Sequence, residues 1–275
     1  MLLRIVYTFF DQLVRHIEKI KRNIHFIKCM YVIGIFLLSI LIPFIFVSTS
    51  IVRGVELFSM DEAPFGKSYD DWVAEFWNWV VSLSLDEATP KPGGCLIHES
   101  GSMVMLMNSA VGGSHNQVCT ISSGQGILIP MWNAWCDSGD HTGLSDEQLT
   151  KCAREVFNLG KIGSEVRVDD VPVAKLDVTM SLISGSLDYE ITTLQNVSEI
   201  YTKGFNITIP ADSNIPELVP GDWRAGSHGW WVFLEPLPPG KYMVSYNVRV
   251  FPTGALTSPG VNPTSSDITY LLNVT

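Results

Sequence analysis

Residues 230–251 read WWVFLEPLPPGKYMVSYNVRVF, and this stretch decides the expected fold class. Two runs rich in aromatic and β-branched residues, a composition typical of strands, flank a segment with three prolines and a glycine. We therefore predict a β-hairpin whose turn is Pro236 to Gly240.

Similar short apolar runs lie on both sides of this segment, separated by Gly, Ser, Asn or Pro. The predicted strands cover 95–98, 103–107, 117–121, 127–132, 164–168, 171–182, 186–193, 205–209, 229–235, 241–251 and 267–274. Many short strands with such turns favour a mainly β fold, which we expect to be a β-sandwich or jelly-roll-like domain.

Two accessory helices are expected beside the strands. The first begins after Ser68, which can form a capping box with Asp71, and it carries apolar residues at helical spacing as far as Leu83. The second runs from about Ser145 to Leu159 and is followed by a glycine. Because the first helix is aromatic on most sides, we expect it to be buried against a large surface.

An uncharged run near the N-terminus predicts a membrane anchor. Cys29 to Val47 reads CMYVIGIFLLSILIPFIFV, and about 20 apolar residues span a bilayer core of roughly 30 Å. Basic residues dominate residues 1–28, which also have an amphipathic pattern, so this segment should stay in the cytoplasm. We predict a single-pass protein of the cell membrane, with its transmembrane helix in 29–52, a linker in 53–67 and an extracytoplasmic β-rich domain in 68–275.

A cleaved signal peptide is the alternative. Cleavage after about Ser50, where small residues cluster, would give a secreted protein. The long basic leader and the long apolar run favour the retained anchor, because signal peptides have shorter apolar regions of about 7–15 residues. Both interpretations export the domain.

Charge is divided unevenly along the chain. Residues 1–53 hold seven of the 18 basic and two of the 28 acidic residues, so residues 54–275 hold 11 basic and 26 acidic residues, a net charge of −15. Such a domain repels nucleic acid, and we expect no nucleic-acid partner.

The exported domain offers sites for two covalent modifications. An even number of cysteines in an exported domain predicts disulfides, and these cysteines are Cys95, Cys119, Cys136 and Cys152. Of three possible pairings we favour Cys95–Cys119 and Cys136–Cys152, because each closes a short loop. N-x-S/T sequons that a glycosylating host could use begin at Asn196, Asn206 and Asn273.

A search for catalytic and metal-binding patterns is mostly negative. The chain has no GxSxG, HExxH or P-loop motif, so no cofactor and no catalytic residue are predicted. Imidazole and thioether ligands suit copper, which makes His98, His115 and Met105 candidate ligands. The competing interpretation is that Met105 lies on the core face of a strand with its neighbouring methionines.

Tryptophans provide the candidate ligand-binding residues. Trp223, Trp230 and Trp231 are flanked by glycines, which suggests a groove carried by loops that could stack against a sugar. The competing interpretation is burial, because large aromatic side chains are usually buried.

Three stretches together carry a family resemblance. They are FGKSYDDWVAEFWNWVVSL (65–83), VCTISSGQGILIPMWNAWC (118–136) and GWWVFLEPLPPGKYMVSYNV (229–248). The chain resembles an uncharacterised family of exported microbial proteins with a Trp-rich N-terminal helix, a Cys-Thr…Gly…Pro strand segment and a late aromatic segment with a Pro-Gly turn. The resemblance implies export and a compact β-rich domain, and it brings no known activity.

The sequence favours a non-catalytic protein. We predict a membrane-anchored extracytoplasmic binding or envelope-structural module, with a glycan or an envelope or membrane protein as its partner. The alternatives are an accessory subunit of a membrane protein complex and an exported hydrolase or metal-handling protein.

Overall fold

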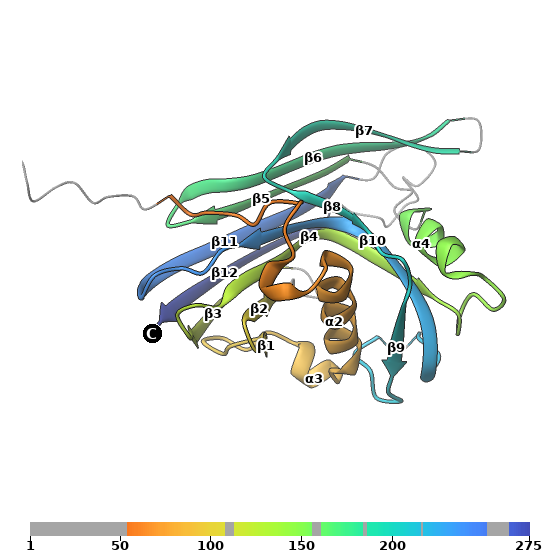
Figure 1. Ribbon diagram of the computed structural model, residues 1–275, viewed down its shortest axis with the longest axis horizontal. Helices are drawn as coiled ribbons and strands as arrows, with labels where there is room; N and C mark the ends of the chain where they lie inside the picture. The colour runs from red at the N-terminus through yellow and green to blue at the C-terminus, as the bar shows by residue number, and fades with distance from the viewer. Residues whose placement is uncertain (1–53, 108–112, 156–160, 184–185, 216, 252–263) are drawn as a thin grey trace, which may run out of the picture. The chain divides into compact units, whose positions relative to one another are not determined.

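The computed structural model describes residues 54–107, 113–155, 161–183, 186–215, 217–251 and 264–275, and Val55–Thr275 forms one compact unit (Figure 1). Among the described residues its fold is mainly β, with two six-stranded sheets and few helices, which confirms the predicted mainly β class and is consistent with a β-sandwich. Among the residues that the structure describes, no helix is both long and apolar enough to cross a bilayer. The predicted cytoplasmic segment (1–28) and transmembrane helix (29–52) lie outside the described residues.

The first sheet has the order β1-β2-β4-β10-β8, and β9 also pairs with β10. Its strands are β1 (Ile97–Ser100), β2 (Met103–Leu106), β4 (Gly126–Asp137), β8 (Ser198–Tyr201), β9 (Phe205–Ile209) and β10 (Gly221–Leu234). β2 and β4 are parallel, and the other neighbours are antiparallel.

The second sheet has the order β3-β12-β11-β5-β6-β7. Its strands are β3 (Gly113–Ile121), β5 (Lys161–Val168), β6 (Val171–Ile183), β7 (Ser186–Gln195), β11 (Gly240–Phe251) and β12 (Thr264–Val274). β3 pairs with β12 in parallel, although the two strands are far apart in the sequence.

The two sheets pack face to face around the main core. Alternate residues of β5 point inward, as the burial of Ile162, Val166 and Val168 shows, and the residues between them face outward. This period of two is what a sheet with one buried and one solvated face requires. The first sheet contributes Ile127, Ile129 and other side chains of β4 and β10 to the same core.

α2 and α3 form a third layer on the other face of the first sheet (Figure 1). α2 (Tyr69–Ser82) packs there through a second core that includes Trp72, Phe76 and Trp231, and the short helix α3 (Leu85–Ala88) follows it. Because the first sheet is covered on both faces, β10 is buried from Ala225 to Leu234, and its last six residues, GWWVFL, are apolar without alternation. The Ser68–Asp71 capping box at the start of α2 is present, as predicted.

α4 (Asp146–Glu155) packs on β10 and β4, with Leu149 and Ala153 buried against Cys136. A disulfide between Cys136 and Cys152 joins this helix to β4, and Cys95–Cys119 joins the segment before β1 to β3. Both predicted disulfide pairings are therefore confirmed.

The predicted hairpin at Pro236–Gly240 is wrong. β10 belongs to the first sheet and β11 to the second, so the connection crosses between the sheets instead of pairing two neighbours. Next to the connection both edges of β10 are already occupied, one by β4 and the other by residues 56–58, through the Leu57–Leu234 bridge and the Phe58 N–H that donates to the Phe233 carbonyl. The connection cannot extend a ladder because its three prolines have no N–H group. Leu237 is buried in the core between the sheets and fixes the crossing there.

Candidate functional site

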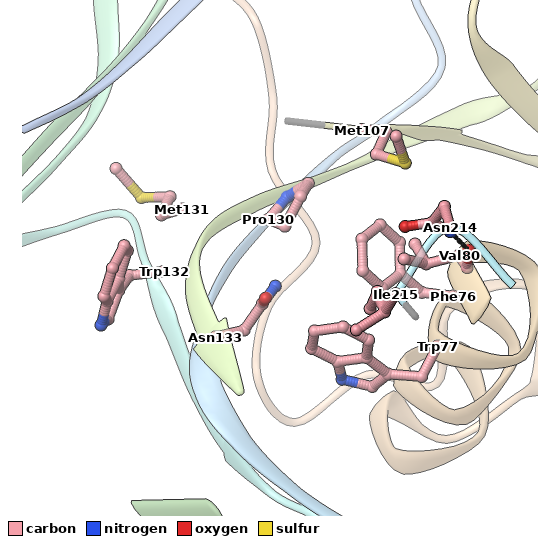
Figure 2. Close-up of a pocket in the computed structure, with 10 residues that line it drawn as sticks. All are labelled: Phe76, Trp77, Val80, Met107, Pro130, Met131, Trp132, Asn133, Asn214 and Ile215. Carbon is pink, nitrogen blue, oxygen red and sulfur yellow. Dashed lines mark hydrogen bonds between the residues drawn. The ribbon is translucent and has the colours of Figure 1, made fainter. Parts of the chain in front are cut away.

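A cavity of about 230 Å³ lies between α2 and β4 (Figure 2). Its walls are mainly aromatic and aliphatic, with two asparagines. The lining residues are Phe76, Trp77, Val80, Met107, Pro130, Met131, Trp132, Asn133, Asn214 and Ile215. Ligand sites are typically apolar hollows with a few polar groups, so this cavity is the candidate binding site.

The end of strand β2 makes room for the cavity. β2 pairs with β4 only as far as Met105 opposite Leu128, and Met107 lines the cavity just beyond this point. Pro130 of β4 lies just beyond this point, and it has no N–H to donate to the carbonyl of a neighbouring strand. The cavity therefore forms where the β2–β4 pairing stops.

A bulge in β4 sorts the side chains around the cavity. Trp231 of β10 lies opposite Pro130, and Trp230 lies opposite Trp132, so Met131 is the extra residue. Met131 and Trp132 consequently both pack toward the core between the sheets, while Asn133 returns to the α2 side (Figure 2). The bulge brings Asn133 into the wall that faces Trp77.

Trp77 is held in place by contacts on two sides. Its Nε1–H donates to Ser227 Oγ at 2.8 Å, and the Ser227 hydroxyl in turn donates to the carbonyl oxygen of Ala134 at 2.7 Å. Its ring lies 4.2 Å from that of Trp135, centroid to centroid. A fixed indole wall suits a preformed binding cavity.

Asn214 closes the cavity at the C-terminal end of α2. Its backbone N–H donates to the Leu83 carbonyl at 2.7 Å, and its side-chain amide donates to the carbonyls of Leu83, at 3.1 Å, and Val80. The Val80 carbonyl lies in the last turn of α2, where it also accepts the Leu83 backbone N–H at 3.4 Å, and Leu83 is the residue that ends the helix. Asn214 therefore caps α2 from a distant loop.

We expect Asn214→Ala to lower the free energy of unfolding by about 1–3 kcal/mol, because it removes the side-chain hydrogen bonds to the Val80 and Leu83 carbonyls, while the backbone N–H of residue 214 still donates to Leu83. Urea denaturation of the full-length protein measures this change. The matched control is Asp212→Ala, an exposed residue of the same loop, which should leave stability unchanged. Equal stability of the two variants would contradict the capping role.

Asn133 contributes one of the two polar side chains of the cavity wall. Its Nδ2 is buried and has no hydrogen-bond partner in the described part of the chain. A buried donor without a partner costs free energy that a ligand's acceptor would recover. None of the ten described residues in the lining has a titratable side chain.

The predicted tryptophan groove does not form around Trp230 and Trp231. Their side chains are 1% and 0% exposed; Trp230 packs in the core between the sheets and Trp231 under α2. Trp223 is half-buried, and its Nε1–H donates to the Val219 carbonyl at 2.8 Å. Because successive side chains of a strand point to opposite faces of its sheet, the indoles of Trp230 and Trp231 lie on opposite faces of the first sheet.

The three candidate metal ligands are divided between the sheets. His98 and Met105 are paired neighbours on β1 and β2, whereas His115 lies on β3 of the second sheet. His98 stacks on Trp79 and has its Nε2 3.7 Å from Glu75 Oε1. Met105 is fully buried in the core under α2, as the competing interpretation expected.

The Glu75 carboxylate beside His98 has a lowered pKa. Burial alone would raise it, but hydrogen bonds from Lys67 and Ser100, the Lys67 charge and His98 together outweigh burial. Lys67 also lies over the ring of Trp72 at 4.2 Å from its centroid. Glu75 is therefore held as an anion in an ion pair at the surface of α2.

Cys136, His141 and Cys152 bring possible ligand atoms within 4.8 Å of one another. The two sulfur atoms are bonded to each other, so they are not thiolates that could hold a metal. The acidic loop that precedes α4 is organised by Asp137, whose Oδ1 accepts the backbone N–H groups of Gly139 and Asp140.

The three sequons lie at different places on the second and first sheets. Asn196 follows β7 and is exposed, and its amide donates to the Val173 carbonyl at 2.8 Å. Asn206 on β9 is exposed and accepts a hydrogen bond from Arg224. Asn273 on β12 is half-buried and pairs with Lys241. Glycosylation at these asparagines stays a prediction.

Comparison with known proteins adds no family. No family model matches the sequence, and no curated protein matches it. A chain in the structure of PbICP-C in complex with falcipain-2 is 13% identical, with a TM-score of 0.23 over 64% of this chain and 100% of that one. CfaE, the adhesive subunit of CFA/I fimbria of enterotoxigenic Escherichia coli, is 13% identical, with a TM-score of 0.14 over 67% of this chain and 50% of that one. Likeness at this level carries no argument about function.

Proposed function

We propose that this chain is an exported, membrane-anchored binding module whose cavity between α2 and β4 takes one ring-sized, mainly apolar group of its ligand. The observation that carries the proposal is an aromatic and aliphatic cavity whose wall includes Asn133, the Nδ2 of which has no hydrogen-bond partner among the residues that the structure describes. The two disulfides support a place in an oxidising compartment outside the cytoplasm.

The volume limits what can enter. A cavity of about 150 Å³ can hold benzene, so the present cavity of about 230 Å³ fits a group somewhat larger, such as an indole or one sugar ring. An oxygen of a sugar ring would accept the Asn133 Nδ2–H, and the π face of an indole would accept it more weakly. The absence of a titratable group from the lining favours a binding module over a hydrolase.

Filling the cavity should abolish binding. Val80 lines it from α2, and Val80→Phe places a ring in the space that the ligand would occupy. We expect affinity for a single-ring probe such as indole, measured by calorimetry on the full-length protein, to fall at least about tenfold, with about 1–3 kcal/mol of destabilisation from overpacking. Val80→Ala enlarges the cavity instead, and should admit larger rings.

The control is Val171→Phe, at an exposed position of the second sheet, which should bind indole as the unchanged protein does. If Val80→Phe retains the affinity of that control, the cavity is not the binding site.

A further inference from the structure

A second hollow, of about 550 Å³, lies between α4 and the end of β8 and is cationic. Its lining residues are Glu147, Thr150, Lys151, Arg154, Tyr201, Thr202 and Lys203. We call it the α4–β8 groove. It shares no lining residue with the cavity under α2.

The charge of the groove is opposite to that of the domain. The lining residues comprise three cations, Lys151, Arg154 and Lys203, and one carboxylate, Glu147, which gives the lining a net charge of +2 in a domain of net charge −15. Two further carboxylates lie beside this lining: Glu155, 3.8 Å from Lys151 Nζ, and Glu199, which accepts from the Tyr201 hydroxyl. Three of the groove's four α4 residues lie three, four and seven positions after Glu147, and this spacing puts all four on one helix face. The positive side chains are thus gathered by the helix geometry.

The wall formed by α4 is fixed to the sheet by several contacts. Thr150 Oγ1 donates to the Thr202 carbonyl at 2.8 Å, which joins the two sides of the groove. Gly226 allows α4 to approach β10 closely, because a Cβ at this position would lie 2.3 Å from the backbone nitrogen of Thr150. The Cys136–Cys152 disulfide holds the same helix to β4. A wall fixed in this way is preorganised for a ligand.

Tyr201 provides an aromatic surface in the groove. Its ring stacks on the buried ring of His228, with centroids 4.3 Å apart, and its hydroxyl donates to Glu199 Oε1 at 2.7 Å. Glu199 Oε1 also lies 2.9 Å from His228 Nε2. These contacts set the orientation of Tyr201, yet the residue is 43% exposed.

We propose that the α4–β8 groove binds an acidic carbohydrate, a sugar that carries carboxylate or sulfate groups. The cations would pair with the anionic groups, for which the Arg154 guanidinium is geometrically suited. The apolar C–H face of the sugar ring would pack on Tyr201. This proposal does not depend on the cavity under α2, since either site can bind while the other does not.

The test uses two forms of one sugar polymer on the full-length protein. Oligogalacturonate carries a carboxylate on every ring, and its fully methyl-esterified form is neutral. We expect calorimetry to detect saturable binding of the first and none of the second, with an affinity that falls as salt is added. Inorganic sulfate should compete only weakly, because it offers no ring to Tyr201.

Variants separate the parts of the site. Lys151→Gln and Lys203→Gln should each weaken binding about twofold to fivefold, as expected for exposed ion pairs. Tyr201→Phe keeps the ring and should retain affinity, whereas Tyr201→Ala should lower it about tenfold. The controls are Lys175→Gln and Arg249→Gln, which remove cations from the outer face of the second sheet and should change nothing.

Unfolding curves like that of the unchanged protein confirm that each variant is folded. Equal binding of the neutral ester, or a loss of affinity in the two controls in place of the groove variants, would overturn the assignment. Failure to bind oligogalacturonate and a sulfated oligosaccharide would overturn it as well, while indole binding under α2 would remain unaffected.

Discussion

Trp231→Ala is expected to lower the free energy of unfolding by about 3–5 kcal/mol, the cost of truncating a large buried aromatic side chain. Trp231 is fully buried between the first sheet and α2, with its ring edge-on to Phe76 at 5.0 Å between centroids. Its Nε1 has no hydrogen-bond partner in the described part of the chain, so the loss is one of packing. Guanidinium denaturation of the full-length protein measures it.

Two controls define this result. Trp231→Phe keeps an aromatic ring and should lose less, and Trp223→Ala should cost about 1 kcal/mol because Trp223 is only half-buried. A Trp231→Ala variant of unchanged stability that no longer bound ligand would contradict the burial of Trp231 under α2 and favour the groove expected from the sequence.

Loss of both disulfides is expected to leave the domain unfolded. Removing one native disulfide from a small exported domain typically costs about 2–5 kcal/mol, and the whole stability of a domain is about 5–15 kcal/mol. The pairs join residues 24 and 16 positions apart, so each constrains the unfolded chain. The fourfold Cys→Ser variant should show no cooperative unfolding transition.

Variants that lack only one disulfide should differ in which segment loses its protection from amide exchange. Without Cys136–Cys152, α4 keeps only a small apolar cluster around Leu149 and Ala153, so amide exchange should rise in this helix first. Without Cys95–Cys119, the segment before β1 is released from β3 and α4 should stay protected. Titratable thiols at Cys95, Cys119, Cys136 and Cys152 in the stable, native protein would contradict both the pairing and the oxidising compartment.

Local patterns in the sequence predicted much of the fold. The alternation in β5 and β9 and the capping box before α2 each depend on residues close in the sequence, and the structure contains all three elements. The disulfide pairings were also predictable, because each joins neighbouring segments. Such features need no knowledge of which sheet a strand joins.

Other features depend on tertiary contacts. β10 begins at Gly221, whereas the sequence predicted a strand only from 229, because GDWRAGSH contains glycine and charged residues that strands disfavour. β4, β9 and α4 pack against this segment and make it a strand. The sequence analysis did not predict β8, because a strand of four residues depends on its pairing with β10. The change of sheet after β10 could not be distinguished from a hairpin by local sequence alone.

The cavity could not be predicted from the sequence, because its walls come from segments that are distant along the chain. Asn214 lies in a loop without a regular pattern, and its role follows only from where α2 ends. Pro130 carried the one available signal, since a proline inside an apolar strand indicates a bulge or an unpaired edge.

The most direct test follows the Asn133 side-chain amide by NMR while indole is added to the full-length protein with labelled asparagine and tryptophan. The binding account predicts saturable shifts of the Asn133 Nδ2–H and Trp77 Nε1–H signals in the unchanged protein, no shift in Val80→Phe, and none at the exposed Asn196 in either. Shifts confined to other residues, or no saturable shift at any signal, would contradict the proposed cavity as the ligand site.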